Sequence, residues 1–137
     1  MIQVFFDGSY GPRFPNGTAA YGFVVKGESV YKSYGRVGSG PGFSCNCAEY
    51  EGLYQAMLYV QEHFPSEKVT FRGDSTLVIN QMNKVSKAKK GHYLPYYEKS
   101  RALAEPYIES QQWSFEWIAR AFNSEADELA QYQRSKE

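Results

Sequence analysis

The sequence predicts a single α/β domain over residues 1–137, built on a mixed sheet with helices on its faces. The chain is 42% hydrophobic and has 12 tyrosines and 9 phenylalanines, which is enough apolar material for one core. Three short strand-like segments come first and are joined by short turn-rich connections, as in an antiparallel meander. Strand and helix patterns then alternate to the end of the chain, which is typical of parallel strands joined by helices.

The meander occupies the first third of the chain. Its strands are expected at residues 2–6, 21–26 and 30–37. The first is a short apolar run that ends at Asp7, Gly8 and Ser9, as a buried strand does when it enters a loop. The segment 8–18 is rich in glycine and proline, so a loop or hairpin is expected there. The glycine-rich segment 38–42 ends the meander.

A helical period begins at Cys47 and continues to Phe64. Apolar side chains recur at spacings of four, three and four residues, at Leu53, Met57, Val60 and Phe64. Further strands are expected at 68–73 and 113–119, and further helices at 75–83, 95–107 and 124–134. The order β-β-β-α-β-α-α-β-α therefore predicts a five-stranded sheet, with a three-strand antiparallel meander, two parallel strands and helices on both faces.

Charge is balanced overall but not along the chain. There are 15 basic and 15 acidic residues, and six of the basic residues lie within 84–101, where Glu98 is the one acid. A short basic segment on a neutral protein favours a local contact with an anion over a general nucleic-acid coat. A solvated lysine-rich loop explains the same segment equally well.

The composition also bears on location. No apolar run approaches the roughly 20 residues that span a bilayer. The first residues lack the features of a signal peptide, and the two cysteines, Cys45 and Cys47, are too close for a useful bridge. These features predict a reduced, cytoplasmic protein with no membrane contact.

Four carboxylates fall where the predicted fold would bring them together. Asp7 and Asp74 follow strands that would be parallel neighbours, so both would emerge at one edge of the sheet. Glu49, in the first turn of its helix, shares the sheet-facing side with Leu53, and Asp127 opens the last helix. Carboxylates that lack basic partners repel one another unless divalent cations lie between them. Oxygen ligands favour Mg²⁺ or Mn²⁺ over zinc.

Each acid also has a local structural explanation. Asp7 suits a turn before glycine, and Asp74 and Glu49 suit the start of a helix. Ser124 and Asp127 form an S-x-x-D pattern, an acidic variant of the capping box. The expected convergence of all four acids favours the metal site.

Four strings carry a resemblance to a known family. They are F-F-D-G-S at 5–9, A-E-Y-E-G-L at 48–53, G-D-S at 73–75 and N-S-E-A-D-E-L-A at 123–130. In this order and spacing they resemble the signature segments of type 1 ribonuclease H over nearly the whole chain. The resemblance implies a ribonuclease H-like fold and an endonuclease that hydrolyses the RNA strand of RNA–DNA hybrids. It also implies a D-E-D-D metal site, here Asp7, Glu49, Asp74 and Asp127.

The charges suggest how such a site would act. Asp7, on the central strand, is best placed to bridge two Mg²⁺ ions, for which Mn²⁺ could substitute. Attack by an activated water would leave 5′-phosphate and 3′-hydroxyl ends. Two alternatives are a catalytically silent hybrid-binding module and a DNA-acting nuclease of the same fold.

Substrate contacts are expected where the chain matches or departs from the family pattern. Ser44-Cys45-Asn46 stands in place of the usual T-N-N, with Ser44 available to a phosphate and Asn46 to the minor groove. The loop histidine of many members is missing, and Arg120 and Asn123 resemble an R-x-x-N-x-x-A-D variant.

Two further contacts are expected around the site. Asn16 is a candidate for the DNA backbone. Lys87, Lys89 and Lys90 would supply a reduced version of the basic protrusion of some bacterial members. A monomer that binds the hybrid without an obligate protein partner is expected.

Overall fold

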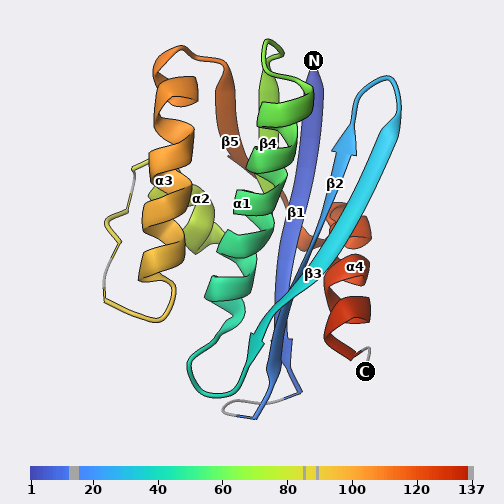
Figure 1. The fold of residues 1–137 in the computed structure, drawn as a ribbon, viewed down its shortest axis with the longest axis vertical. Coiled ribbons are helices and arrows are strands. Elements are labelled where there is room, and N and C mark those ends of the chain that lie inside the picture. The colour runs from blue at the N-terminus through green and yellow to red at the C-terminus, as the bar shows by residue number, and fades with distance from the viewer. Residues whose placement is uncertain (13–15, 85, 89, 136–137) are drawn as a thin grey trace.

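Five strands form one mixed sheet in the order β3-β2-β1-β4-β5 (Figure 1). The structure is a computed structural model that describes residues 1–12, 16–84, 86–88 and 90–135. The strands are β1 (Ile2–Gly11), β2 (Thr18–Lys26), β3 (Val30–Ser39), β4 (Val69–Gly73) and β5 (Trp113–Trp117). Strands β1, β2 and β3 pair antiparallel, and β4 pairs parallel with both β1 and β5. The predicted meander and the two added parallel strands are confirmed.

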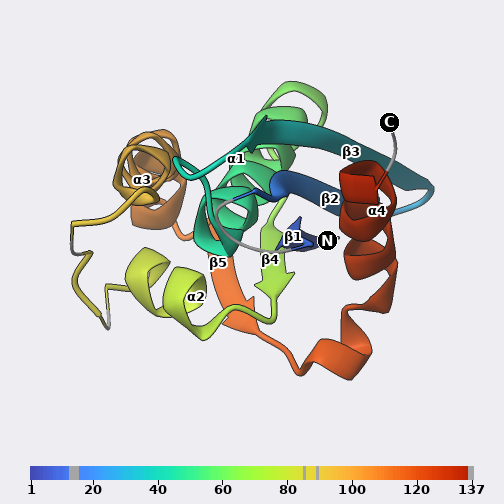
Figure 2. The same cartoon turned by 90° about the horizontal axis from the view of Figure 1, so that it is seen from below.

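Helices cover both faces of this sheet, as predicted. The helical elements are α1 (Cys45–His63), α2 (Thr76–Met82), α3 (Leu94–Glu109), the 3₁₀ turn η1 (Arg120–Phe122) and α4 (Ser124–Ser135). Figure 2 shows α4 alone beside the meander, whereas α1, α2 and α3 lie on the other side of the sheet. In the described part of the chain, no helix combines the length and the apolar character needed to cross a bilayer.

The core lies between the sheet and α1. Ile2, Val4 and Phe6 alternate along β1 and are at most 4% exposed, and the predicted stripe on α1 packs against them. Glycines let the helices approach closely. A Cβ at Gly8 would clash with the backbone of α1 at Glu49, and a Cβ at Gly22 would meet Leu129 of α4. Both helices are therefore seated against the sheet on either side of Asp7, which pairs with Gly22.

Strand β1 is longer than expected, so the prediction that Asp7 ends it is wrong. The ladder with β4 stops at Phe5 and Arg72, but pairing with β2 continues to Gly11. Asp7 thus lies inside β1, just beyond the point where its parallel neighbour turns away. The glycine and proline residues of the segment 8–18 suggested a loop. The sequence does not show that β2 begins at Thr18 and supplies pairing partners for this part of β1.

Helix α1 begins two residues earlier than its periodicity indicated. The side chain of Ser44 caps it by accepting a hydrogen bond from the backbone N–H of Cys47. Glu49 therefore lies in the second turn and not the first, where the sequence analysis put it. At the other end of the chain β5 stops at Trp117, and the unpredicted turn η1 leads into α4.

Candidate metal centre

Three of the four predicted carboxylates converge at the edge where β4 ends. Asp7 comes from β1, Glu49 from α1, and Asp74 from the residue that follows β4. One oxygen from each lies within 4.8 Å of the other two. Figure 2 looks onto this edge of the sheet. Elements separated by tens of residues in the chain thus place three anionic groups together.

Burial dominates the electrostatics of this cluster. Asp7 is 3% exposed and Glu49 is 7% exposed. Burial, and to a lesser extent the charge of Asp74, raise the pKa of Asp7 to about 7, although a hydrogen bond with Glu49 lowers it. The pKa of Glu49 is raised well above its ordinary value by burial and then by the charge of Asp7. Burial also raises the pKa of Asp74, partly offset by a hydrogen bond from Asn123.

The cluster lacks the partner that buried carboxylates need. Oε2 of Glu49 is buried without a hydrogen-bond partner. Among the residues that the structure describes, no basic side chain forms an ion pair with Asp7, Glu49 or Asp74. A divalent cation would supply the missing positive charge, and an all-oxygen donor set suits Mg²⁺ or Mn²⁺. The residues present therefore fit the predicted metal.

Asp127 lies beside this cluster and outside the group of three. A hydrogen bond with Asp127 is among the interactions that raise the pKa of Asp7, so the two side chains are neighbours. Both Asp127 oxygens accept from Nε2 of Gln131, at 3.2 and 3.1 Å. Nη2 of Arg120 lies 3.8 Å from Oδ1 of Asp127.

The capping-box alternative for Asp127 does not match the observed start of α4. That pattern needs Ser124 ahead of the helix, but α4 begins at Ser124 and Asn123 precedes it. The backbone N–H of Asp127 donates to the carbonyl of Asn123 at 3.1 Å, an ordinary helical bond. The carboxylate of Asp127 is therefore not committed to the helix start.

Asp74 precedes the N-cap of α2 and is contacted by Trp117. Ser75 caps α2 by accepting from the N–H of Val78 at 3.3 Å, which leaves the side chain of Asp74 outside the cap. Nε1 of Trp117 donates to the carbonyl of Asp74 at 3.2 Å. Trp117 itself is 52% exposed at the end of β5.

Asn123 is placed differently from the prediction. It is 1% exposed, and its Nδ2 donates to the carbonyl of Phe6 at 2.9 Å and to Oδ2 of Asp74 at 3.5 Å. Such burial disagrees with the expected direct contact with substrate. Arg120, by contrast, has 77% of its side chain exposed and is available to a ligand. No local sequence signal distinguished the two residues, because both lie in one short segment after β5.

The remaining predicted substrate residues surround this edge of the sheet at several places. Ser44 is half-buried and its hydroxyl is engaged in capping α1, whereas Asn46 is half-buried in the first turn. Asn16 is exposed between β1 and β2. Lys87 and Lys90 are exposed between α2 and α3, and Lys89 lies outside the described residues. The contacts of these residues with substrate stay predictions.

The sequence of the chain is similar to those of known proteins. A family model described as reverse transcriptase-like matches residues 6–133. The bifunctional protein Rv2228c of Mycobacterium tuberculosis is 30% identical over 131 residues, which cover 94% of this chain and 35% of that protein. The uncharacterized protein YpeP of Bacillus subtilis is 32% identical and is covered over 57% of its length. The chain thus spans 35% to 57% of the length of these relatives.

Solved structures resemble the chain over nearly its full length. LC11-RNase H1 in complex with an RNA/DNA hybrid superposes with a TM-score of 0.82 at 27% identity, covering 98% of this chain and 96% of that one. The N-terminal RNase H domain of Rv2228c gives a TM-score of 0.81 at 29% identity and covers 98% of each chain. The predicted five-stranded architecture is confirmed by both.

Proposed function

The chain belongs to the reverse transcriptase-like family, whose model matches residues 6–133, and its fold matches type 1 ribonuclease H structures. We propose that it hydrolyses the RNA strand of RNA–DNA hybrids. One observation carries the proposal. Asp7, Glu49 and Asp74 bring carboxylate oxygens within 4.8 Å of one another at the edge of the sheet, and none of them forms an ion pair with a basic side chain among the described residues. The complex of the related LC11-RNase H1 with an RNA/DNA hybrid supports the choice of substrate.

We assign Asp7, Glu49, Asp74 and Asp127 as catalytic residues that hold the metal. When bound, two Mg²⁺ ions would lower the pKa of an attacking water and stabilise the leaving 3′ oxygen, giving 5′-phosphate and 3′-hydroxyl ends. The carboxylates themselves supply negative charge at fixed positions, since β1, α1 and β4 are packed elements of the fold. Mn²⁺ would substitute because it accepts the same oxygen ligands.

Selectivity for the hybrid is proposed to come from the residues around the carboxylates. Asn46 and Ser44 lie at the start of α1, three and five residues from Glu49 along the chain. This place suits contact of Asn46 with the minor groove and its 2′-hydroxyls, and contact of Ser44 with a phosphate. Arg120 is exposed beside Asp127 and can meet a phosphate. Asn16, Lys87 and Lys90 are exposed farther out, where they would contact the backbone of the duplex.

A strand-labelled cleavage assay tests the proposal. The purified chain is incubated with RNA–DNA hybrid, duplex RNA or duplex DNA, each with Mg²⁺ or with EDTA. We expect cutting of the RNA strand of the hybrid only, and none in EDTA. Efficient cutting of a DNA strand would establish the DNA-acting alternative, and binding of the hybrid without cutting would establish the silent module.

Three properties of the whole molecule complete the proposal. One sheet and one core support residues 1–137 as a single catalytic domain. Cys45 and Cys47 are free thiols, which agrees with a reducing location such as the cytoplasm. We also propose a monomer, which sedimentation analysis would check.

A further inference from the structure

Asn123 makes contacts with three segments that carry the carboxylates. Its Nδ2 donates to the carbonyl of Phe6, the residue before Asp7, at 2.9 Å. The same nitrogen lies 3.5 Å from Oδ2 of Asp74. Its own carbonyl accepts the backbone N–H of Asp127 at 3.1 Å. One buried side chain and its backbone therefore connect β1, the end of β4 and the start of α4.

The side-chain amide of Asn123 lies at the end of the ladder between β1 and β4. Phe6 lies one residue beyond Phe5 and Arg72, the last pair of the β1–β4 ladder. Its carbonyl would lack a donor from β4, because the chain leaves the sheet at Asp74. The Asn123 amide supplies that donor and so closes the end of the ladder. It also fixes the separation between Asp74 and the backbone that carries Asp7.

We propose that Asn123 is a positioning residue that holds Asp74 and Asp127 against β1 in the arrangement that binds the metal. This inference rests on the proposed function and assigns Asn123 no contact with the substrate. At 1% exposure its amide is closed off from a duplex, but it reaches two ligand-bearing segments directly. Groups that orient metal ligands typically change metal affinity by about 10- to 100-fold when removed.

The test compares Asn123→Ser with the parent protein. Serine retains a residue that suits the position before a helix, but is too short to reach the carbonyl of Phe6. Asn123→Ala serves as a second variant. The matched control is Asn83→Ala, because Nδ2 of Asn83 also donates to a strand carbonyl, that of Phe115 at 3.0 Å, away from the carboxylates. Melting temperatures identify the range in which each variant is folded.

Two binding measurements separate positioning from a merely structural role. Mn²⁺ and Mg²⁺ are titrated calorimetrically into the metal-free proteins without nucleic acid, and hybrid binding is measured in EDTA by fluorescence anisotropy. For Asn123→Ser we expect metal affinity about tenfold weaker, hybrid affinity close to that of the parent, and a lower kcat with little change in KM. Asn83→Ala should lose stability and keep its metal affinity.

The outcomes distinguish the inference from the proposed function. Parent-like metal affinity in folded Asn123→Ser overturns the positioning role while leaving the nuclease proposal intact. Weaker hybrid binding with unchanged metal affinity makes Asn123 a substrate contact and also overturns it. If the parent protein binds neither cation, the metal site and this inference fail together.

Discussion

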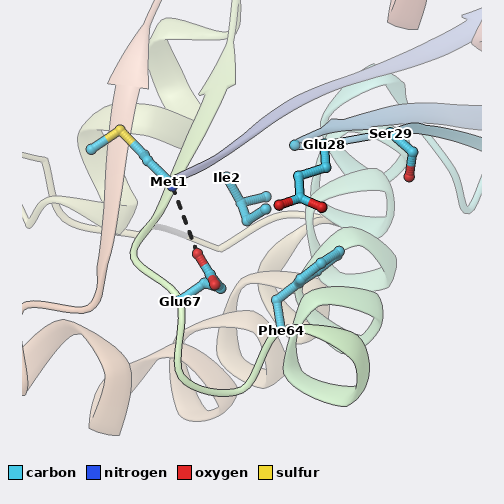
Figure 3. A pocket seen from close by; sticks show the side chains of 7 residues that line it. Met1, Ile2, Glu28, Ser29, Phe64 and Glu67 are labelled. Atoms are coloured by element: carbon cyan, nitrogen blue, oxygen red, sulfur yellow. Dashed lines mark ion pairs between the residues drawn. The ribbon is translucent and has the colours of Figure 1, made fainter.

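The two ends of the central strand both present acids, but in opposite environments. Beside the first residue of β1, a hollow of about 510 Å³ is lined by Met1, Ile2, Phe64 and Glu67 together with the turn 27–29 (Figure 3). Glu67 has 49% of its side chain exposed and lies 3.7 Å from the N-terminal ammonium group. At the other end Asp7 and Glu49 are buried and have no such partner among the described residues.

This difference shows that the shape of the surface does not locate the reactive site. The hollow in Figure 3 is a large one, yet its acids are solvated and need no ligand. Burial of unpaired carboxylates costs folding free energy, so their presence indicates a function that requires them.

The same contrast exists within α1. Glu51 is as buried as Glu49, at 9% exposed, but it accepts from Nζ of Lys99 and from Nε2 of Gln55, each at 2.6 Å. Two acids two residues apart on one helix thus have opposite electrostatic situations. The cation for Glu51 is part of the protein, whereas the proposed cation for Glu49 would come from solution.

The largest effect is expected from Asp7→Asn. Cleavage of the hybrid should fall by at least about 10²-fold, the cost of losing one strong electrostatic stabiliser. The melting temperature without metal should stay the same or rise, because the change relieves carboxylate repulsion. Glu67→Gln, at the other end of β1, is the control and should keep full activity. A large loss of stability in Asp7→Asn would instead indicate a structural role.

The second effect distinguishes metal binding from helix capping at Asp127. Asp127→Asn should fold normally and lose turnover, with partial recovery in Mn²⁺, since an amide cannot balance a divalent cation. Ser124→Ala should keep most activity and, because α4 begins at Ser124, cost little stability. Initial rates and thermal unfolding measure both. Full activity in folded Asp127→Asn would reduce the site to three carboxylates.

A smaller effect is expected in the pH dependence of stability. The folded-state pKa of Asp7 is raised from 3.8 to about 7, so between these values the folded protein binds more protons than the unfolded chain. The free energy of unfolding without metal should therefore fall as pH rises through this range. Melting curves at about pH 5 and about pH 8, on either side of most of this change, check it. Asp7→Asn should flatten the pH dependence of stability, and Mg²⁺ should restore the stability of the parent protein at the higher pH. The same pH dependence in parent and variant would contradict the assigned burial of Asp7.

The smallest effect is expected from the basic loop. Replacing Lys87 and Lys90 by alanine should weaken hybrid binding modestly and reduce the salt slope by about 0.9 for each phosphate that is no longer neutralised. Lys68→Ala, exposed near the opposite end of the sheet, is the control and should leave the slope unchanged. Anisotropy titrations at several salt concentrations measure this. An unchanged salt slope in the double variant would show that Lys87 and Lys90 belong to an ordinary solvated loop.

The sequence by itself determined the order of the strands and main helices, and it singled out three carboxylates, Asp7, Glu49 and Asp74, that the fold brings together. The stripe at Leu53, Met57 and Val60 predicts α1, because helical periodicity is a local property of the chain. A helix with such a stripe can pack its apolar face on a sheet. Asp7 and Asp74 were predicted to share an edge because parallel strands direct their carboxyl ends the same way. That rule held even though the expected end of β1 was wrong.

Only the tertiary structure decided what surrounds those acids. Asp7 stays within a strand because β2 supplies its partners, and Asn123 turns inward because the carbonyl of Phe6 lacks a donor once β4 has ended. Burial of Glu49 likewise depends on how closely α1 approaches β1 at Gly8. These outcomes depend on atoms far apart in the chain, since hydrogen-bond satisfaction and desolvation are set by whichever segments meet in space.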